Sequence, residues 1–508
     1  MQRLSFLTRT SLLLSCFFAL DKILAFAKTL IFNKVVRLEG MGIFSAANNL
    51  PDGLSALLSG GALGIAFIPV LRETIDRQGQ SAAWDLFSRI INLAFVVTGA
   101  LSIAIIALAT PFVRWIVAPG FSPADQALTV SLMRLDLVAI LIFSISGLVM
   151  AGLHANQHFL LPALAPLFYN LGQLFGALIL SPASGLHIVG MQLPAFGLGL
   201  HGLVYGVIIG ASLHLLIQVP GLLRFKFQWT PVLETRSAGV RRVLLLLWPR
   251  VLTMACIQAY FIARDRFGSQ FATAGVGALN LAWTIEQVPE TIIGSAIAVA
   301  ILPSLAEFID RGLISDFVRT VNRALRIMLA FCLPAAALIA LTIRPLAAAF
   351  FNYDAAQLDL LTFCTWAFLA GLVGDTWLEV AVRSHYANLN TRTPLIAAVL
   401  QVSAFVLLSL LLPHWFGLPG IPLAAALTFT IQALSLLALL NRRFPGLMDM
   451  GGTALRAVGG AIAAALIAAA ALSYVPLSSP VAAGIALLAG AVIAVPFVWR
   501  ELQLLLHL

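Results

Sequence analysis

Charged side chains are scarce in this sequence. Asp, Glu, Lys and Arg make up 10% of its 508 residues, whereas soluble domains contain about 25%. The net charge is +9, but the Lys and Arg residues stand singly or in pairs between apolar stretches, so no nucleic-acid partner is expected. With 61% hydrophobic residues, the composition excludes a water-soluble globular protein.

Motifs for metal, nucleotide or redox chemistry are missing as well. The four cysteines fall inside apolar stretches without CxxC spacing, and the eight histidines are scattered without an HExxH pattern. A P-loop does not occur. We therefore predict no metal site, no cofactor, no catalytic residue and no enzymatic activity.

Long apolar runs, by contrast, are abundant. Each run of about 20 residues can cross a hydrocarbon core of roughly 30 Å as a helix. We predict an all-α polytopic membrane protein with fourteen transmembrane helices, of which the second and eighth are long enough to be bent or broken. The predicted spans are 10–33, 41–70, 87–110, 128–152, 158–180, 197–222, 240–262, 273–305, 322–348, 359–383, 393–413, 420–440, 454–474 and 480–500.

The distribution of positive charge predicts how these spans are oriented. Of the 30 Lys and Arg residues, 20 lie on the side that holds the N-terminus. Loops rich in Lys and Arg stay in the cytoplasm, so both termini are predicted to be cytoplasmic. Six basic residues are placed on the other side, namely Lys34, Arg37, Arg114, Arg264, Arg266 and Arg344.

An internal repeat relates the two halves of the chain. The segment 66–77 is echoed by 300–311, and the match aligns Pro69 with Pro303. Spans 1–6 therefore repeat as spans 7–12 and start from the same face of the membrane. Weaker matches pair Lys22 with Arg250, Asn156 with Asn388, Pro162 with Pro394, and Gly202 with Gly420.

The repeat predicts a domain organisation. Two six-helix lobes, residues 1–225 and 226–445, are expected to be related by a pseudo-two-fold axis along the membrane normal, with the substrate site between them. Residues 446–508 form two further helices outside the repeat, and their many small residues allow close packing or a lateral groove.

Five motifs follow one another across roughly residues 10–440. Their order resembles the MurJ/MviN lipid II flippase family of the MOP superfamily. The resemblance implies a V-shaped pair of lobes, fourteen helices and a groove for a lipid tail along the last two helices. The motifs are Asn49-Leu50-Pro51-Asp52 leading to Phe67-Ile68-Pro69-Val70-Leu71, Leu132-Met133-Arg134, Gly152 through Phe159 to Pro162-Ala163-Leu164-Ala165-Pro166, Ile301-Leu302-Pro303-Ser304-Leu305, and Asn390-Thr391-Arg392-Thr393-Pro394.

The chain departs from this family at several charged positions. Where the family usually places arginines in the first span, this sequence has Lys22 and Lys28, which keep the charge but not the planar fork that binds a diphosphate. Two further family arginines are replaced by Ser55 and Thr284. The resemblance therefore implies a polyprenyl-diphosphate-linked glycan as the substrate class, with lipid II or another such glycan as the cargo.

Ionisable residues inside a span are candidates for function because they are costly to insert. Lys22 and Lys28 share one polar face of the first span with Asp21 and Thr29, and we predict that this face lines the cavity and binds the substrate. The alternative is that the two lysines extend to the membrane interface.

Four more residues are predicted to contact the substrate. Arg250 is the repeat mate of Lys22, with a cytoplasmic anchor as its alternative role. Asp52 follows Pro51, where a broken helix exposes polar backbone. Glu286 and Glu290 share a helix face and suit a cation, a proton or a basic partner, with simple charge pairing as the alternative.

Other charged residues are interpreted as structural. Asp375, Glu379 and Arg383 form a stripe along the tenth span that we interpret as a salt bridge. Arg134 and Asp136 are expected to anchor the start of the fourth span.

The leading functional hypothesis is a flippase that moves a lipid-linked glycan diphosphate from the cytoplasmic to the outer leaflet of the bacterial inner membrane, for peptidoglycan synthesis. Its expected partners are this substrate and membrane lipids, and the protein is expected to be a monomer driven by the membrane potential or a monovalent cation. The alternatives are a cation-coupled drug or metabolite antiporter of the same superfamily and, with little support in the short outer loops, a membrane-bound transferase.

Overall fold

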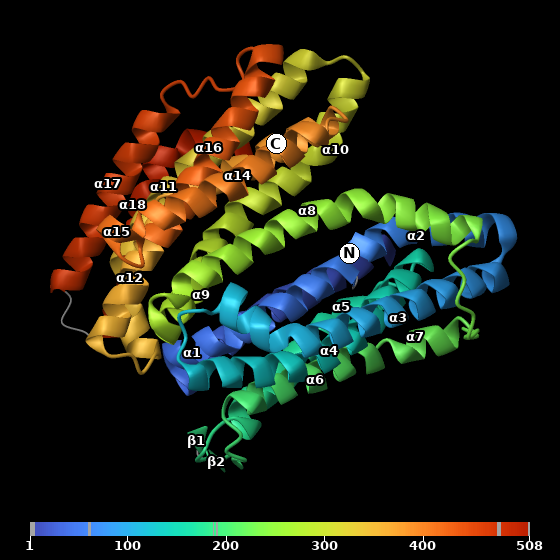
Figure 1. Ribbon diagram of the computed structural model, residues 1–508. Coiled ribbons are helices and arrows are strands. Elements are labelled where there is room, and N and C mark those ends of the chain that lie inside the picture. Colours follow the sequence, from blue (N-terminus) through green and yellow to red (C-terminus); the bar gives the residue numbers. More distant parts are fainter. Residues whose placement is uncertain (1–5, 59–61, 186, 189–190, 475–478, 506–508) are drawn as a thin grey trace. The chain divides into compact units, whose positions relative to one another are not determined.

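The computed structural model describes the backbone of residues 6–58, 62–185, 187–188, 191–474 and 479–505. Apart from one short hairpin, the elements in these ranges are helices (Figure 1). Ten helices among the described residues are long and apolar enough to cross a membrane, or eleven when the pair α12 and α13, bent by 42°, is taken as one span. The all-helical polytopic fold is therefore confirmed, while the number of fourteen spans stays a prediction.

The chain divides into two compact units, Met1–Thr273 and Ala274–Leu508. In the first unit, α1 packs against α4, α5 and α8, and α4 packs against α3 and α6. The elements of this unit are α1 (Phe6–Leu58), α2 (Ala62–Gln78), α3 (Gln80–Phe112), η1 (Val113–Val117), α4 (Pro123–Ala155), α5 (Leu160–Phe175), η2 (Gly176–Leu180), β1 (His187–Ile188), β2 (Met191–Gln192), α6 (Leu200–Leu216), α7 (Val219–Arg224) and α8 (Ala238–Ser269).

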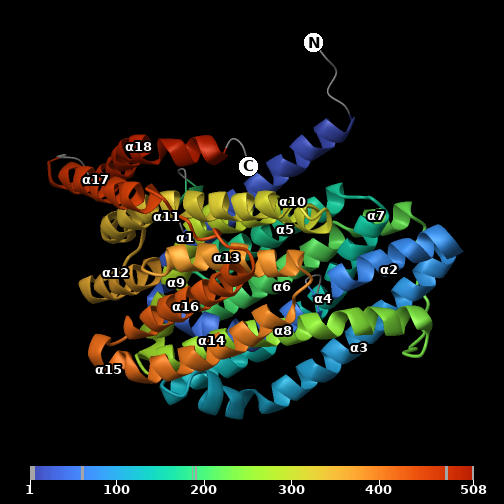
Figure 2. The same ribbon diagram turned by 90° about the horizontal axis from the view of Figure 1, so that it is seen from above.

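The second unit contains the remaining helices. Within it α17 lies beside α18 and both pack against α11 (Figure 2). Its elements are α9 (Ala272–Pro289), η3 (Glu290–Ser295), α10 (Ala296–Asp310), α11 (Ile314–Phe350), α12 (Ala355–Leu369), α13 (Leu372–Ala387), α14 (Arg392–Leu411), α15 (Pro413–Phe416), α16 (Gly420–Arg443), α17 (Thr453–Tyr474) and α18 (Ser479–Leu505).

The first predicted span and the start of the second belong to one long helix, α1, and are not separated by a loop. A single residue, Arg37, leaves the helical conformation within α1, with φ 55° and ψ −178°. Such a conformation costs an L residue about 1–3 kcal/mol. Residues 59–61 of the second predicted span lie outside the described residues, and the eighth span contains the π-helical turns of η3 within one helical run, Ala272–Asp310. The expectation that these two spans are bent or broken therefore stays a prediction.

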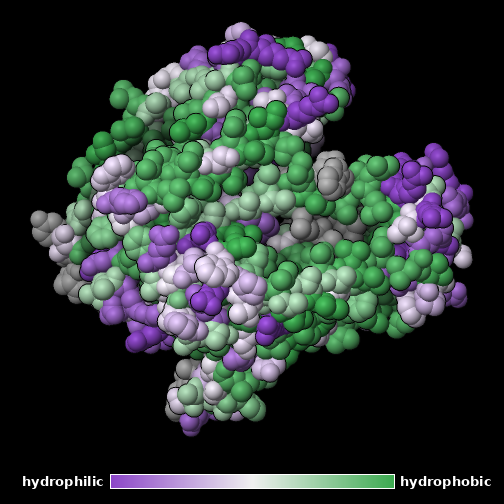
Figure 3. All heavy atoms as spheres, in the orientation of Figure 1, coloured by the Kyte–Doolittle hydropathy of each residue, from purple (hydrophilic) through white to green (hydrophobic). Residues whose placement is uncertain are grey.

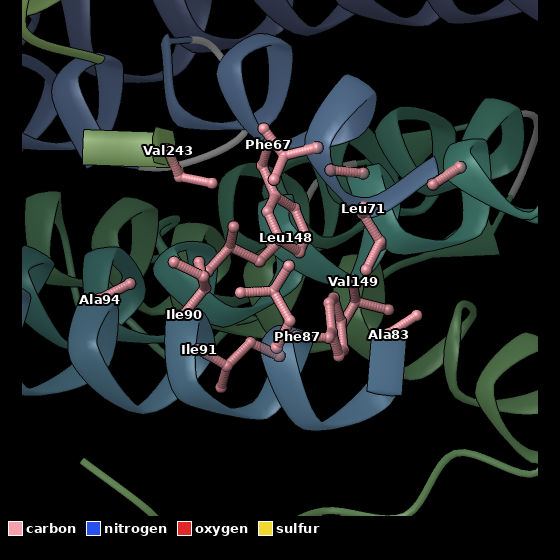
Figure 4. Close-up of a cluster of buried hydrophobic side chains, with 14 of the residues drawn as sticks. Phe67, Leu71, Ala83, Phe87, Ile90, Ile91, Ala94, Leu148, Val149 and Val243 are labelled. Carbon is pink, nitrogen blue, oxygen red and sulfur yellow. The ribbon is translucent and has the colours of Figure 1, made fainter. Parts of the chain in front are cut away.

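The core of the first unit explains why α8 belongs to it. The rings of Phe67 on α2 and Phe87 on α3 stack with their centroids 5.8 Å apart. Leu148 from α4 and Val243 from α8 belong to the same buried cluster (Figure 4). Four helices thus share one apolar core, and α8 supplies part of it although the repeat assigns this helix to the second lobe.

Glycines bring α5 and η2 unusually close to α6. A Cβ atom on Gly172 would lie 2.3 Å from the Cα of Gly210, and one on Gly176 would lie 2.6 Å from the Cα of Gly206. Side chains cannot occupy such gaps, so the two backbones touch along this interface. Gly202, Gly206 and Gly210 therefore allow α6 to pack directly against the backbone of α5 and η2.

Corresponding turns occur in the two units. After α4, Gln157 has φ 56° and the side chain of Asn156 donates to the backbone oxygen of Gly152 at 2.8 Å. After α13, Leu389 has φ 57° and Asn388 donates to the oxygen of Ser384 at 2.9 Å. The sequence echo between these segments therefore corresponds to the same local structure. The pseudo-two-fold axis itself stays a prediction.

The surface is largely apolar along the helices, as expected of spans that face lipid. Hydrophilic side chains gather at the end of the first unit where α2 meets α3, at the right of Figure 3. There Arg77 pairs with Glu73 at 3.0 Å, and Arg242 of α8 pairs with the same carboxylate at 2.5 Å. This polar end is suited to an aqueous boundary of the membrane.

Candidate functional site

A polar cluster in the first unit forms where α1 meets α5. The Nζ atom of Lys28 donates to Oε1 of Gln173 at 2.6 Å and lies 5.8 Å from the ring centroid of Tyr169. The Nε2 atom of Gln173 in turn donates to the Tyr169 hydroxyl at 2.8 Å. The ammonium group is therefore held by one amide and one aromatic ring.

A second link joins the same two helices. Asn170 Nδ2 donates to Oδ1 of Asp21 at 2.8 Å. Tyr169, Asn170 and Gln173 lie within one turn of α5, so they present their polar groups together. Sequence reasoning missed these three because the fifth span was treated as an uninterrupted apolar run. Their spacing within that run was the signal that would have found them.

Asp21 and Lys28 both reach α5, so they lie on one face of the first span; that this face lines the cavity and binds the substrate stays a prediction. Lys22 is solvent-exposed, whereas Lys28 is partly buried. Asp52, which lies on α1 beyond the break, is also exposed, and the charges of Asp21 and Asp52 both act on Lys28. Lys22 is thus the lysine whose charge is open to an incoming anion.

A buried ion pair lies farther along α1 and α8. Arg264 and Asp265 are 3.0 Å apart, with 3% and 2% of their side chains exposed. Asn49 Nδ2 donates to Asp265 Oδ2 at 2.8 Å. Arg264 therefore lies inside α8, two residues beyond the end predicted for that span, and the side of the membrane on which it lies stays a prediction. The adjacent carboxylate of Asp265 neutralises its charge and allows it to be buried within α8.

The backbone of Arg250 is part of α8, but the structure does not describe the side chain of this residue. Its proposed place opposite Lys22 therefore stays a prediction.

The second unit holds a cluster of acidic side chains. Glu286 on α9 is 0% exposed and Glu290, at the start of η3, is 6% exposed. The carboxyl group of Glu286 lies within hydrogen-bonding reach of Asp375 on α13. Arg383 forms an ion pair with Glu379, which confirms that part of the predicted salt-bridge stripe. Asp375 instead faces another carboxyl group.

Hydroxyl groups complete this cluster around Glu290. Ser295 Oγ donates to Glu290 Oε1 at 3.2 Å, and Thr291 Oγ1 donates to Oε2 at 3.3 Å. Among the described residues, no group of three or more Asp, Glu, His or Cys side chains is arranged to hold a metal ion. The carboxylates are therefore spread along two helices and do not form a cage.

An apolar cavity of about 600 Å³ lies elsewhere in the second unit, between α11, α12, α17 and α18. Leu341, Phe363 and Leu472 contribute to its walls, and Arg344 pairs with Asp359 at 2.8 Å beside them. Its walls are compatible with a hydrocarbon chain. The groove for a lipid tail that the resemblance implied stays a prediction.

Solved structures of transporters share this fold. One, described as lipid II flippase MurJ in an inward closed conformation, has a TM-score of 0.76 and 19% identity, and the match covers 97% of this chain and 100% of that one. A multidrug resistance MATE transporter of the MOP superfamily has a TM-score of 0.70 and 13% identity, with 85% and 96% coverage. The chain thus has the polytopic helical fold that these transporters share.

The family follows from the sequence comparisons. The model for "Lipid II flippase MurJ" matches residues 40–492. The lipid II flippase MurJ of Burkholderia cenocepacia is 26% identical over 455 residues, which cover 86% of this chain and 84% of the relative. The chain therefore belongs to the lipid II flippase MurJ family, and the resemblance noted in the sequence is confirmed.

Proposed function

We propose that this protein is a flippase that translocates a polyprenyl-diphosphate-linked cell-wall precursor of the lipid II type from the cytoplasmic to the outer leaflet. The family match over residues 40–492 is the observation that carries this proposal. The work of such a protein is transport by alternating access and not catalysis of a reaction. Its place is the inner membrane of a bacterium, and its product supplies peptidoglycan synthesis.

The proposed architecture has fourteen membrane spans. Spans 1–6 and 7–12 form two lobes related about the membrane normal, and both termini lie in the cytoplasm. According to the repeat, the first lobe comprises residues 1–225, the second lobe residues 226–445 and the two extra helices residues 446–508. The compact unit of the structure extends further, to Thr273, because α8 packs onto α1, α2 and α3. We propose that the protein works as a monomer.

The proposed substrate site uses the polar face of α1. Lys22, being exposed, binds the diphosphate by charge-assisted hydrogen bonds. Lys28, already held by Gln173, adds positive potential and exchanges that amide for a phosphate oxygen when the substrate enters. Asp52 and Arg250 complete the substrate-facing set in this proposal. Glu286 and Glu290 are buried, so they would reach a substrate only after a rearrangement of α9 and η3.

Complementation tests this proposal directly. The gene is expressed in cells depleted of their own lipid II flippase, and membrane insertion is checked by immunoblot. Growth should be restored. If the inserted protein fails while a family member with the usual arginines succeeds, lipid II is not the substrate.

The buried carboxylates favour a second candidate function, a cation-coupled antiporter of a drug or metabolite. The two functions differ in what proteoliposomes containing the protein do. An antiporter exchanges a cation for a soluble substrate without any lipid-linked glycan, whereas the flippase moves the labelled lipid between leaflets.

A further inference from the structure

Two acidic rows face each other inside the second unit. Glu286 and Glu290 are four residues apart on α9 and η3, and Asp375 and Glu379 are four residues apart on α13. These elements pack together, because α13 contacts η3 directly. The π-helical turns of η3 begin at Glu290, and such turns recur at functional sites in helical proteins.

Glu286 and Asp375, the first residue of each row, each have one carboxyl oxygen that receives no hydrogen bond. Glu286 is fully buried and its Oε1 atom receives no hydrogen bond, and the same holds for Oδ1 of Asp375. Gln287 donates to the other oxygen of Glu286 at 3.3 Å. The two carboxyl groups nevertheless lie within hydrogen-bonding reach of each other. Two ionised carboxylates only accept hydrogen bonds, so this contact requires a donor between them.

The charged groups around Glu286 and Asp375 do not supply the hydrogen-bond donor that this contact requires. The charged groups that act on the pair are Glu290 on η3 and Glu379 on α13, and the thiol of Cys332 on α11 lies near Glu286. Arg383 is the cation that acts on Glu290, and it is already paired with Glu379. Two ionised carboxylates side by side in a buried site repel each other and lose hydration, so one of them retains a proton.

We propose that Glu286 and Asp375 form a proton-binding site in which one proton is shared between the two carboxyl groups. Glu290, held by Ser295 and Thr291, is close enough to act on Glu286, and the partly exposed Glu379 and Arg383 act on Glu290 in turn. The row therefore offers a route by which the proton exchanges with water. Coupling of this proton to transport rests on the proposed flippase function, whereas proton binding itself does not.

Infrared spectroscopy of the purified full-length protein in lipid tests proton binding. The wild-type protein should show the C=O band of a buried protonated carboxyl group, with a shift in D₂O. The band should disappear in Glu286→Gln and in Asp375→Asn, because the amide then donates to the remaining carboxylate in place of the proton. Glu307→Gln, a half-exposed glutamate on α10, is the matched control and should keep the band.

Stability measurements separate loss of the proton from loss of folding. The amide variants should melt close to the wild-type temperature, whereas Glu286→Leu, which leaves Asp375 buried without a donor, should melt lower. Absence of the band in the folded wild-type protein, or its persistence in both amide variants, overturns the proposal.

A flipping assay in proteoliposomes then tests the coupling. With an imposed pH gradient and no membrane potential, the wild-type protein should accumulate labelled lipid in one leaflet. Glu286→Gln and Asp375→Asn should lose this response to the gradient, whereas Glu307→Gln should keep it. If no lipid moves in any sample but the carboxyl band is present, the flippase proposal fails and the proton site stands. If Glu286→Gln follows the gradient like the wild type, the coupling role is wrong.

Discussion

At the scale of single residues, Lys22 and Lys28 carry the same charge on the same helix in different surroundings. Lys22 is exposed, so its replacement should leave the fold intact. Lys22→Ala should abolish transport, because removing the partner of a sequestered anion costs about 3–5 kcal/mol. Lys22→Arg should remain active, since arginine keeps the positive charge at this position. A lipid-flipping assay in proteoliposomes measures both variants.

The matched control for this prediction is Lys34→Ala, another exposed lysine on α1, which should flip lipid at the wild-type rate. The opposite activities of two variants would support the antiporter. If Lys22→Ala is fully active while Glu286→Gln is dead, the protein is built to handle cations.

Lys28 should contribute to stability as well as to transport. Its hydrogen bond to Gln173 joins α1 to α5, and a bond to a charged group contributes about 1–3 kcal/mol in soluble proteins and less in membranes. A double-mutant cycle with Lys28→Met and Gln173→Leu should therefore give a coupling energy of about 1 kcal/mol in unfolding experiments. Pairing Lys28→Met with Gln126→Leu, whose amide bonds to Ala118, should give none. Equal values in the two cycles would show that the bond adds nothing.

The residues of the site differ in how visible they were to sequence reasoning. Lys22 and Lys28 stood out because a charge within an apolar run is rare and costly. Gln173 and Asn170 did not, because neutral polar residues are tolerated in membrane helices and their partners lie about 150 positions earlier in the chain. Asp375 was assigned to the wrong interaction, because spacing along one helix does not show which face of a second helix it meets.

At the scale of helices, the close contact of η2 with α6 depends on the absence of side chains. Gly176→Leu would drive its Cβ to 2.6 Å from the backbone of Gly206, and overpacking against backbone costs more than about 3 kcal/mol. The variant should lose most of its monodisperse protein in size-exclusion chromatography. Gly484→Leu on α18, where no atom lies within 4 Å of the added Cβ, should elute like the wild type.

Helix boundaries were predictable where composition sets them and less so where packing does. The run 87–110 corresponds to α3 and the run 420–440 to α16, because hydropathy alone defines these spans. The bend of 42° between α12 and α13 was not foreseen, since a single apolar span covered both. It falls at Gly371, where a Cβ would meet the Cα of Ala426 on α16 at 2.6 Å, so a contact with another helix determines its position.

At the scale of the whole molecule, the repeat is visible in local geometry as well as in sequence. Gly79 before α3 has φ 87° and Gly312 before α11 has φ 71°, and each glycine follows a helix that contains a proline. Gly202 and Gly420 each donate to a glycine three residues earlier at 3.0 Å. Two halves that retain the same turns are expected to have arisen by duplication of one six-span unit, with both copies in the same orientation. They should therefore enter the membrane from the same face.

The orientation of that face can be tested with tags in two loops on either side of one span. The loop 181–196 contains no Lys or Arg, whereas the loop 225–237 contains Lys226 and Arg236, and the span Leu200–Arg224 separates them. Because positive loops remain in the cytoplasm, a reporter in 181–196 should be accessible from outside the cell and one in 225–237 should not. A tag after Leu508 serves as a second cytoplasmic marker. External labelling of 225–237 with protection of 181–196 would reverse the topology and place Lys22 and Lys28 at the wrong depth to meet a substrate from the cytoplasm.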